Sequence, residues 1–422
     1  MWERATVEFV LLVPLALLCV LTNRLLPWAA LLCGLFLAGR IYRVVRGGLR
    51  TVFDRRRLAP FVGLFLFMLA VSALITIDPD HSYPQIQRVL VGVVTCLTIR
   101  DWAQIDATHQ RIRLLHMAGV GLGMALALVS PFVVEWQGSK LPNLIPPAIY
   151  ISFPLLTADG ANPNVMAGAL VILWPLALSP LLGWGMGADT PSAQASWAVQ
   201  LLFWLGAISM LVILVLTQSR GAWMGSAAGV LVLANLRLRR LRVITTFLIA
   251  ASLILVLALP TQRTHIAEVL SSGGNISGSA ERIEIWTHAL YVIQDFSFTG
   301  VGMGNFHRVN ELFYPLYIAS PDAPHAHNLF LQVAVDLGIP GLLAWLGIFI
   351  HSIVAAIQAY RYTTSSQIRA LSAGLVTAQV ALAVHGLTDA AVWGVMRTAI
   401  VIWLVWGLAN ALCVVNQRRL AS

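Results

Sequence analysis

Residues 58–77 read LAPFVGLFLFMLAVSALITI, twenty consecutive positions without a charged side chain. At a rise of about 1.5 Å per residue, a helix of this length crosses a hydrocarbon core of about 30 Å. Similar runs recur along the chain, in which 58% of 422 residues are hydrophobic and only 11% are charged. Because the surface of a soluble protein needs far more charge, this composition predicts an all-α polytopic membrane protein.

The apolar runs predict about twelve transmembrane helices. They lie near residues 8–22, 27–42, 58–77, 84–99, 114–134, 162–182, 197–217, 221–236, 243–260, 328–351, 370–388 and 397–415. The first run lacks an obvious small-residue cleavage site, so we expect it to be retained as a span. The chain then divides into spans one to nine at 1–260, a large outer loop at 261–327, and spans ten to twelve at 328–422.

Basic residues give the chain a formal net charge of +9, but they lie between spans and form no continuous face for nucleic acid. Arginine clusters near 40–57, 100–113, 237–242, 361–369 and 418–419 fall in alternate loops, which predicts that these loops and both termini are cytoplasmic. Eight other cationic residues then lie at or near the outer side, where some should bind an anion. They are Arg24, Arg88, Lys140, Arg220, Arg263, Arg282, Arg308 and Arg397.

The four cysteines all lie inside apolar runs and show no CxxC spacing; they are Cys19, Cys33, Cys96 and Cys413. A buried cysteine behaves as a small hydrophobe, and this spacing indicates neither metal nor redox chemistry. We therefore assign the cysteines no function.

The outer loop contains a predicted helix at residues 279–294, SAERIEIWTHALYVIQ. Arg282, Ile285, Trp286, Ala289, Leu290 and Ile293 recur at helical spacing and form one stripe. We expect this stripe to lie on the membrane surface. Arg282 at its end either reaches lipid headgroups or binds a phosphate, for which the guanidinium fork is well suited.

A glycine-rich segment, GVGMGNF, follows at residues 300–306. No parallel strand precedes it, so the pattern predicts a tight turn rather than a dinucleotide site. The backbone amides around Gly302 and Gly304 could still line a pyrophosphate site.

Two histidines precede the tenth predicted span, in APHAHN at residues 323–328. A histidine at the entry of a helix can accept a proton near neutral pH, so His327 is a candidate general base. Residues two apart do not share a helix face, so His325 and His327 are not expected to point into one site if both are helical, and one of them would be a supporting residue. Asp336 lies too far along the helix to orient His327 directly, and a packing role for it is as plausible as a functional one.

The tenth span soon meets Gly338, Pro340 and Gly341, which predicts a kinked or broken helix. Asp389 follows the predicted span 370–388, and Arg397 begins the predicted span 397–415. We expect these two residues to form an ion pair that joins the last two spans.

Arg220 lies in TQSRG at residues 217–221, at the predicted outer turn between two spans. A charge in this position favours a functional role. Gly221, Gly225 and Gly229 follow at intervals of four, a spacing that lets helices approach closely and could hold Arg220 in place.

Three of these features together resemble the O-antigen ligase and polymerase superfamily of envelope glycosyltransferases. They are TQSRG at 217–221, the pair Arg282 and Trp286, and the histidine motif. The histidine motif is the most specific: His327 and Asn328 are followed by nine residues, Gly338, two residues and Gly341. The motif similarity covers roughly residues 210–345, and the span topology extends it over nearly the whole chain.

The resemblance implies a GT-C-like fold in the inner membrane of a Gram-negative bacterium, with a periplasmic active site. The implied reaction transfers polysaccharide from undecaprenyl pyrophosphate to lipid A-core oligosaccharide, without metal or other cofactor and with inversion. Arg220 and Arg282 would hold the donor pyrophosphate, and His327 would deprotonate the acceptor hydroxyl. Nine further residues would support the site: His325, Asn328, Trp286, Gly302, Gly304, Gly338, Gly341, Asp389 and Arg397.

Three alternatives stay open. An O-antigen polymerase usually has two sizeable arginine-rich outer loops, whereas one loop dominates here. A protein O-oligosaccharyltransferase shares the histidine region but would normally be longer, with an extra outer region near its C-terminus. A small-solute transporter fits the topology, but transporters place polar sites at the membrane midplane, and these polar residues gather at the outer edge.

Overall fold

The computed structural model describes residues 6–7, 9, 27–46, 58–104, 109–136, 145–156, 160–184, 197–238, 279–319, 323–394 and 397–421. Within these ranges the chain is helical, and its β-structure is limited to one isolated bridge between Val134 and Ala161. The all-α part of the fold prediction is confirmed. Predicted span 243–260, most of span 8–22 and loop residues 261–278 lie outside the described ranges.

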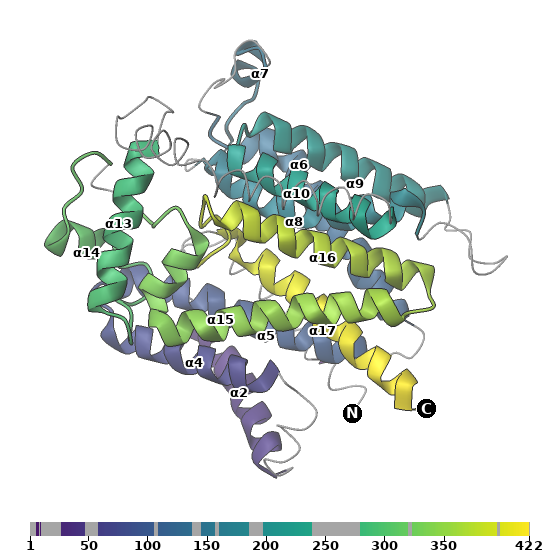
Figure 1. The fold of residues 1–422 in the computed structure, drawn as a ribbon, viewed down its shortest axis with the longest axis horizontal. Helices are drawn as coiled ribbons and strands as arrows, with labels where there is room; N and C mark the ends of the chain where they lie inside the picture. Colours follow the sequence, from purple (N-terminus) through teal and green to yellow (C-terminus); the bar gives the residue numbers. More distant parts are fainter. Residues whose placement is uncertain are drawn as a thin grey trace, which may run out of the picture.

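Most of the long helices run side by side along the long axis of the molecule, and the helices of residues 279–295 and 306–313 lie at one end of it (Figure 1). The helices are α2 (Pro27–Arg46), α4 (Leu58–Ile75), α5 (Pro79–Gln104), α6 (Gln110–Val133), α7 (Ala148–Ile151), α8 (Pro163–Ser179), η1 (Pro180–Trp184), α9 (Trp197–Leu216), α10 (Arg220–Arg237), α13 (Ser279–Asp295), α14 (Phe306–Phe313), α15 (Leu329–Tyr362), α16 (Ser366–Gly386), η2 (Arg397–Ala399) and α17 (Ile400–Ala421).

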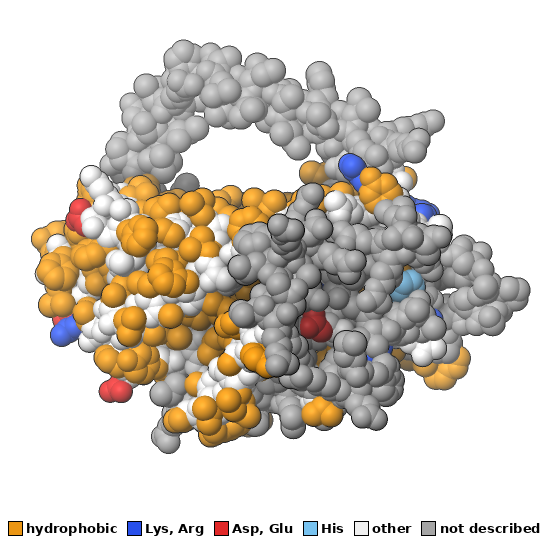
Figure 2. All heavy atoms as spheres, turned by 90° about the horizontal axis from the view of Figure 1, so that it is seen from below, with side chains coloured by type: hydrophobic (Ala, Val, Ile, Leu, Met, Phe, Trp, Pro, Cys, Tyr) orange, Lys and Arg blue, Asp and Glu red, His pale blue; other side chains and the backbone are white. Residues whose placement is uncertain are grey.

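Six of the described helices are long and apolar enough to cross a membrane, which makes this a multi-pass membrane protein. They are Leu58–Ile75, Gln110–Val133, Pro163–Leu182, Trp197–Leu216, Leu329–Tyr362 and Ser366–Gly386. Hydrophobic side chains also dominate the described surface in Figure 2, as lipid contact requires. α2, α5, α10 and α17 lie where four more spans were predicted, but the total of twelve stays a prediction.

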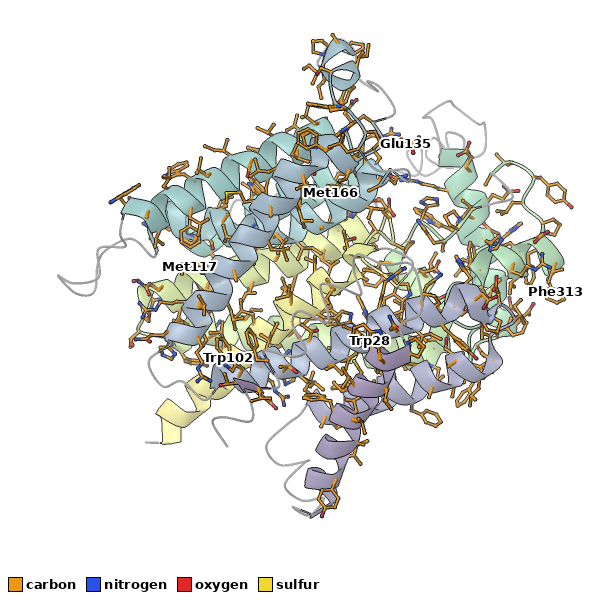
Figure 3. The ribbon with its side chains drawn as sticks, turned by 180° about the vertical axis from the view of Figure 1, so that it is seen from behind. Trp28, Trp102, Met117, Glu135, Met166 and Phe313 are labelled. Atoms are coloured by element: carbon orange, nitrogen blue, oxygen red, sulfur yellow. The ribbon has the colours of Figure 1, made fainter. Side chains whose placement is uncertain are left out.

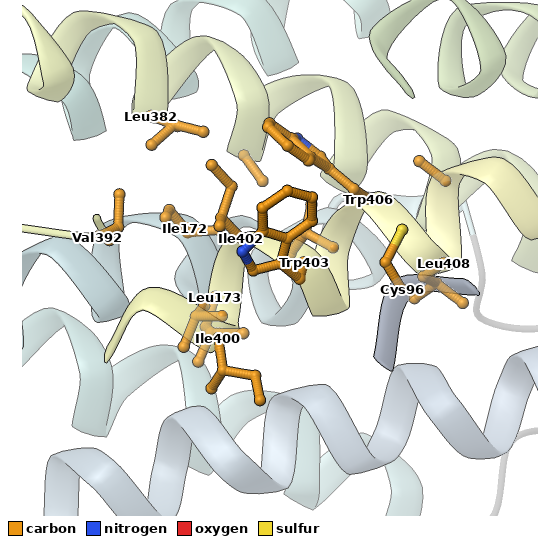
Figure 4. Close-up of a cluster of buried hydrophobic side chains, with 14 of the residues drawn as sticks. Cys96, Ile172, Leu173, Leu382, Val392, Ile400, Ile402, Trp403, Trp406 and Leu408 are labelled. Carbon is orange, nitrogen blue, oxygen red and sulfur yellow. The ribbon is translucent and has the colours of Figure 1, made fainter. Parts of the chain in front are cut away.

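Four buried tryptophans occupy the core between these helices: Trp345, Trp393, Trp403 and Trp406. The rings of Trp403 and Trp406 meet edge to face at 5.0 Å between centroids, within the cluster shown in Figure 4. Gly92 of α5 makes room for Trp403, because a Cβ at this glycine would lie 2.2 Å from Cδ1 of the indole. The small residue therefore lets α5 and α17 pack closely.

The two ends of α16 mark two ends of the molecule. At its first turn, Arg113 Nη1 of α6 donates to Gln367 Oε1 (3.4 Å), and nearby the Tyr360 hydroxyl of α15 donates to Leu236 O of α10 (2.8 Å). We call this the arginine-rich end, after Arg111, Arg113, Arg237, Arg361 and Arg369. The opposite end of α16 contains the candidate site.

Candidate active site

Helix α13 confirms the predicted loop helix, but its apolar stripe packs on protein rather than on the membrane surface. Ile285, Ala289 and Val292 are buried in a cluster with α14 and the start of α15, and Trp286 and Ile293 pack against it. Leu290 alone of the predicted apolar stripe is exposed. The expectation of a surface-lying stripe is therefore wrong, because the loop supplies a small core of its own that buries the same residues. This packing fixes Arg282, on the first turns of α13, relative to α15.

The glycine-rich segment forms the predicted tight turn. Gly300, Gly302 and Gly304 all have positive φ, of 67°, 86° and 78°. The turn packs against α15 through backbone hydrogen bonds, in which Val301 N donates to Val335 O (2.8 Å) and Ile339 N donates to Ser297 O (2.7 Å).

The predicted kink of the tenth span occurs at Gly338, whose φ of 69° and ψ of 178° interrupt the helical backbone of α15. A Cβ on Gly338 would lie 2.2 Å from Phe298 O, so only glycine lets the turn approach this closely. Gly341 follows within the resumed helix, where its own Cβ would meet Leu337.

Buried Asp336 holds α15 against the glycine turn. Its carboxylate is fully buried and accepts hydrogen bonds from Trp393 Nε1 (2.7 Å), Gln332 Nε2 (2.9 Å) and Gly304 N (3.2 Å). Gln332 Oε1 in turn accepts from Ala326 N (2.6 Å), next to the histidines. Asp336 therefore links α15, the glycine turn and the segment after α16, in agreement with the packing role.

His325 and His327 share one site, because neither residue is helical. His327 adopts a left-handed backbone with φ of 47°, and Asn328 caps α15 by accepting from Phe330 N and Leu331 N. The two rings lie 4.3 Å apart between centroids, and His327 N donates to His325 Nδ1 (3.2 Å). The expectation that His325 stands apart from His327 held only for a helix and is corrected here.

Asp389 completes this cluster from the loop after α16. One ring nitrogen of His325, one ring nitrogen of His327 and one carboxylate oxygen of Asp389 all lie within 4.8 Å of one another. The side-chain amide of Asn328 donates to Leu387 O (3.1 Å), which ties the histidine segment to the same loop. The side chain of Arg397 lies outside the described residues, so its ion pair with Asp389 stays a prediction.

Arg282 reaches the cluster from α13 and changes its electrostatics. Burial, and after it the positive charge of Arg282, lower the pKa of His325 to about 4. The pKa of His327 is also lowered to about 4: burial, the neighbouring His325 and Arg282 lower it, and Asp389 opposes them by raising it. Both imidazoles are therefore neutral at physiological pH, which is the form that can accept a proton.

Arg220 is the first residue of α10, and its side chain is exposed. The next residue, Gly221, approaches the loop after α16 so closely that a Cβ would lie 2.0 Å from Thr388 Oγ1. Gly225 and Gly229 continue this approach along α16, with Ala381 O 2.7 Å and Thr377 Cγ2 3.1 Å from their added Cβ positions. The predicted close packing is confirmed, and it brings the backbone of Arg220 beside the residue that precedes Asp389.

Residues 205–346 match the family model described as O-antigen ligase. This segment of the chain is similar to the O-antigen ligases. The matched segment runs from α9 into α15 and includes Arg220, Arg282, His325 and His327. Comparison of the chain with curated proteins gives no match. The similarity supports an enzyme of ligase or polymerase type that acts in O-antigen processing.

The site contains a residue that was not predicted from the sequence. His385 lies 3% exposed near the end of α16 and interacts electrostatically with both Asp389 and Arg282. Its Nε2, like Nδ1 of His327, is buried without a hydrogen-bond partner in the described part of the chain. The sequence does place His385 four residues before Asp389, which could have indicated that the two lie close together. His385 lies inside the predicted span 370–388, however, and was not considered as a site residue.

Glu284 is a second residue near the site that was not predicted from the sequence. Its carboxylate accepts hydrogen bonds from the backbone N–H groups of Tyr317 (2.8 Å), Ile318 (2.8 Å) and Ala319 (2.7 Å). Burial opposes ionisation of this group, but the three hydrogen bonds outweigh it and lower the pKa of Glu284. Glu284 therefore stays charged and holds the loop that leads toward the histidines.

A metal ion is the remaining chemical option for this cluster. Among the described residues, His325, His327 and Asp389 form a group that is close enough to ligate an ion. However, the Arg282 charge acts on both histidines and disfavours a second cation beside them. The arrangement suits an anionic ligand at Arg282 and a proton acceptor at His327 better than it suits a metal.

Proposed function

We propose that this protein is a glycosyltransferase that ligates polysaccharide from undecaprenyl pyrophosphate onto lipid A-core oligosaccharide, without a metal. The observation that carries the proposal is the convergence of Arg282 with His325, His327, His385 and Asp389. In a membrane protein with a segment similar to the O-antigen ligases, this set provides a cation for a diphosphate and a neutral base for an alcohol. We further propose that the site faces the periplasm and that both termini face the cytoplasm.

In the proposed reaction, the acceptor hydroxyl oxygen attacks the anomeric carbon of the donor sugar. The bond between that carbon and the phosphate oxygen breaks, and undecaprenyl pyrophosphate leaves with the electron pair. His327 takes the hydroxyl proton, and attack from the face opposite the pyrophosphate inverts the anomeric centre. A well-positioned general base of this kind typically contributes about 10² to 10⁴-fold in rate.

Arg282 and Arg220 are proposed to hold the pyrophosphate. Charge develops on the departing diphosphate, and fixed donors directed at such charge are worth about 3 to 4 kcal/mol each. Donor binding would also offset the positive charge of Arg282, one of the influences that lower the pKa of His327. The base would therefore become stronger once the donor is bound, and Asp389 would stabilise the imidazolium that forms.

The remaining residues of the site are proposed to keep these groups in position. Asn328 and Asp336 hold the start of α15, and the turn at Gly302 and Gly304 packs against it through Asp336. Trp286 packs against the core of the loop and keeps α13, and hence Arg282, in position.

Lipopolysaccharide gels from a ligase-deficient strain test this proposal. Complementation with the wild-type gene, given adequate expression and matched substrates, is expected to restore the long-chain ladder. His327→Ala and Arg282→Ala should leave unextended core, while Arg308→Ala, which removes an exposed partner of Glu311, should restore the ladder. Failure of the wild type to restore any ladder, or a full ladder from His327→Ala, would contradict the proposal.

A further inference from the structure

A cavity of about 560 Å³ opens at the arginine-rich end, far from the histidine cluster. It lies between the starts of α6, α9 and α16, and Met117, Phe203 and Leu371 form part of its apolar wall. In Figure 3, Met117 and Trp102 lie at the opposite end of the molecule from Phe313 of α14. Because α16 has 21 residues, its two ends are about 30 Å apart, the thickness of a hydrocarbon core.

The charge at this cavity is positive. Arg111 and Arg113 line it together with Gln110 and Gln367, and the described residues of its lining include no Asp or Glu. The Arg111 guanidinium lies 4.8 Å from the ring centroid of Trp102 and donates through Nη1 to Trp102 O (3.0 Å). Those contacts hold the Arg111 guanidinium in place beside the cavity. Arg113 is exposed on the same side, one residue beyond buried Ile112.

These two properties together define the chemistry of a ligand. A soluble anion would need the arginines but not the apolar wall, and a neutral lipid would need the wall but not the arginines. An anionic phospholipid uses both, because its phosphate can pair with guanidinium groups while an acyl chain fills the apolar space. The helices that form the cavity include three of the candidate spans, so the cavity lies where lipid surrounds the protein.

We propose that this cavity binds one anionic phospholipid, with its phosphate held by Arg111 and Arg113 and one acyl chain lying against Met117, Phe203 and Leu371. The site is separate from the proposed active site and lies in the opposite leaflet. It would fix the arginine-rich end of α6 and α16 at the level of the headgroups.

Native mass spectrometry of the full-length, delipidated protein in detergent tests this site. The protein is titrated with phosphatidylglycerol or with phosphatidylcholine of the same acyl chains. We expect the wild type to retain one phosphatidylglycerol with an affinity at least about tenfold higher than for phosphatidylcholine. Arg111→Gln combined with Arg113→Gln should abolish that preference.

Three further variants separate the contributions. Arg113→Gln alone changes an exposed side chain, so it should fold normally and lower phosphatidylglycerol affinity severalfold. Arg361→Gln, at the same end of the molecule but outside the cavity lining, should leave the affinity unchanged. Met117→Trp fills apolar space and should weaken both lipids equally. Size-exclusion elution of each variant without lipid serves as the control for folding.

Equal wild-type affinity for the two lipids would overturn the proposal. So would an unchanged preference in the double Arg111→Gln, Arg113→Gln variant. Displacement of phosphatidylglycerol by millimolar inorganic phosphate would assign the arginines to a soluble anion and would likewise overturn the lipid site.

Discussion

The rings of His325 and His327 lie 4.3 Å apart, and the left-handed backbone of His327 makes this possible. In a regular helix, side chains two positions apart point to different faces. Here the chain turns just before the cap residue Asn328, so both imidazoles face Asp389. Position alone therefore does not distinguish the proposed base, His327, from the supporting His325, but the effects of their substitution on transfer can.

Substitution of His325 is expected to weaken catalysis without abolishing it. His325→Ala removes the acceptor for His327 N and leaves a gap against the ring of His327, so transfer should fall by about tenfold as the base loses its position. His325→Asn keeps a hydrogen-bond acceptor and should recover part of the rate. Single-turnover transfer with purified protein measures both, and equal losses for His325→Ala and His327→Ala would show that His325 does more than position the base.

The pH profile of transfer should reveal the lowered pKa of His327. Its pKa of about 4 in the free enzyme means that the imidazole stays neutral, and active as a base, well below the ordinary value of 6.5. We therefore expect kcat/KM to hold from pH 7 down to about pH 5 and to fall only as pH approaches the lowered pKa. A loss of half the activity near pH 6.5 would contradict the described electrostatics.

Two variants should move that acid limb in opposite directions. Asp389 raises the pKa of His327, so Asp389→Asn should shift the limb to lower pH and reduce the maximal rate. Arg282 lowers the pKa of His327, so Arg282→Gln should shift the limb to higher pH while weakening donor binding. Movement of both limbs in the same direction would show that these two charges do not act on the base as described.

Asp336→Ala is expected to destabilise the protein rather than to change its chemistry. The substitution leaves Trp393 Nε1, Gln332 Nε2 and Gly304 N without the carboxylate that they share. Unpaired buried donors cost about 1 to 3 kcal/mol each when the structure cannot relax, so thermal unfolding in detergent should occur at a clearly lower temperature. Asp336→Asn retains one carbonyl acceptor, and its unfolding temperature should lie between those of Asp336→Ala and the wild type.

Gly338→Ala should disturb the contact between the glycine turn and α15. Its φ is positive and its added Cβ would lie 2.2 Å from Phe298 O, so we expect a loss of about 1 to 3 kcal/mol in the free energy of unfolding. Gly63→Ala in α4 is the matched control, because nothing lies within 4 Å of its added Cβ. This control should be neutral or slightly stabilising.

The sequence predicted local features of the site better than their partners in space. Helical periodicity predicted α13. The glycine-rich segment at 300–306 predicted the tight turn, and Gly338 with Pro340 and Gly341 predicted the kink in α15. Periodicity cannot say whether an apolar stripe meets lipid or protein, which is why the burial of Ile285 against the loop core was not foreseen. His385 was missed for a similar reason, since the packing of α16 against α8 and α10 brings its ring near Asp389 and Arg282.

The most direct test of the central claim is single-turnover transfer by purified His327→Ala at saturating lipid-linked donor, with donor affinity measured on the same preparation. We predict that donor affinity stays within about threefold of the wild type while the transfer rate falls by about 10² to 10⁴-fold. A transfer rate within about threefold of the wild type, from protein that elutes and unfolds normally, would contradict the assignment of His327 as the base.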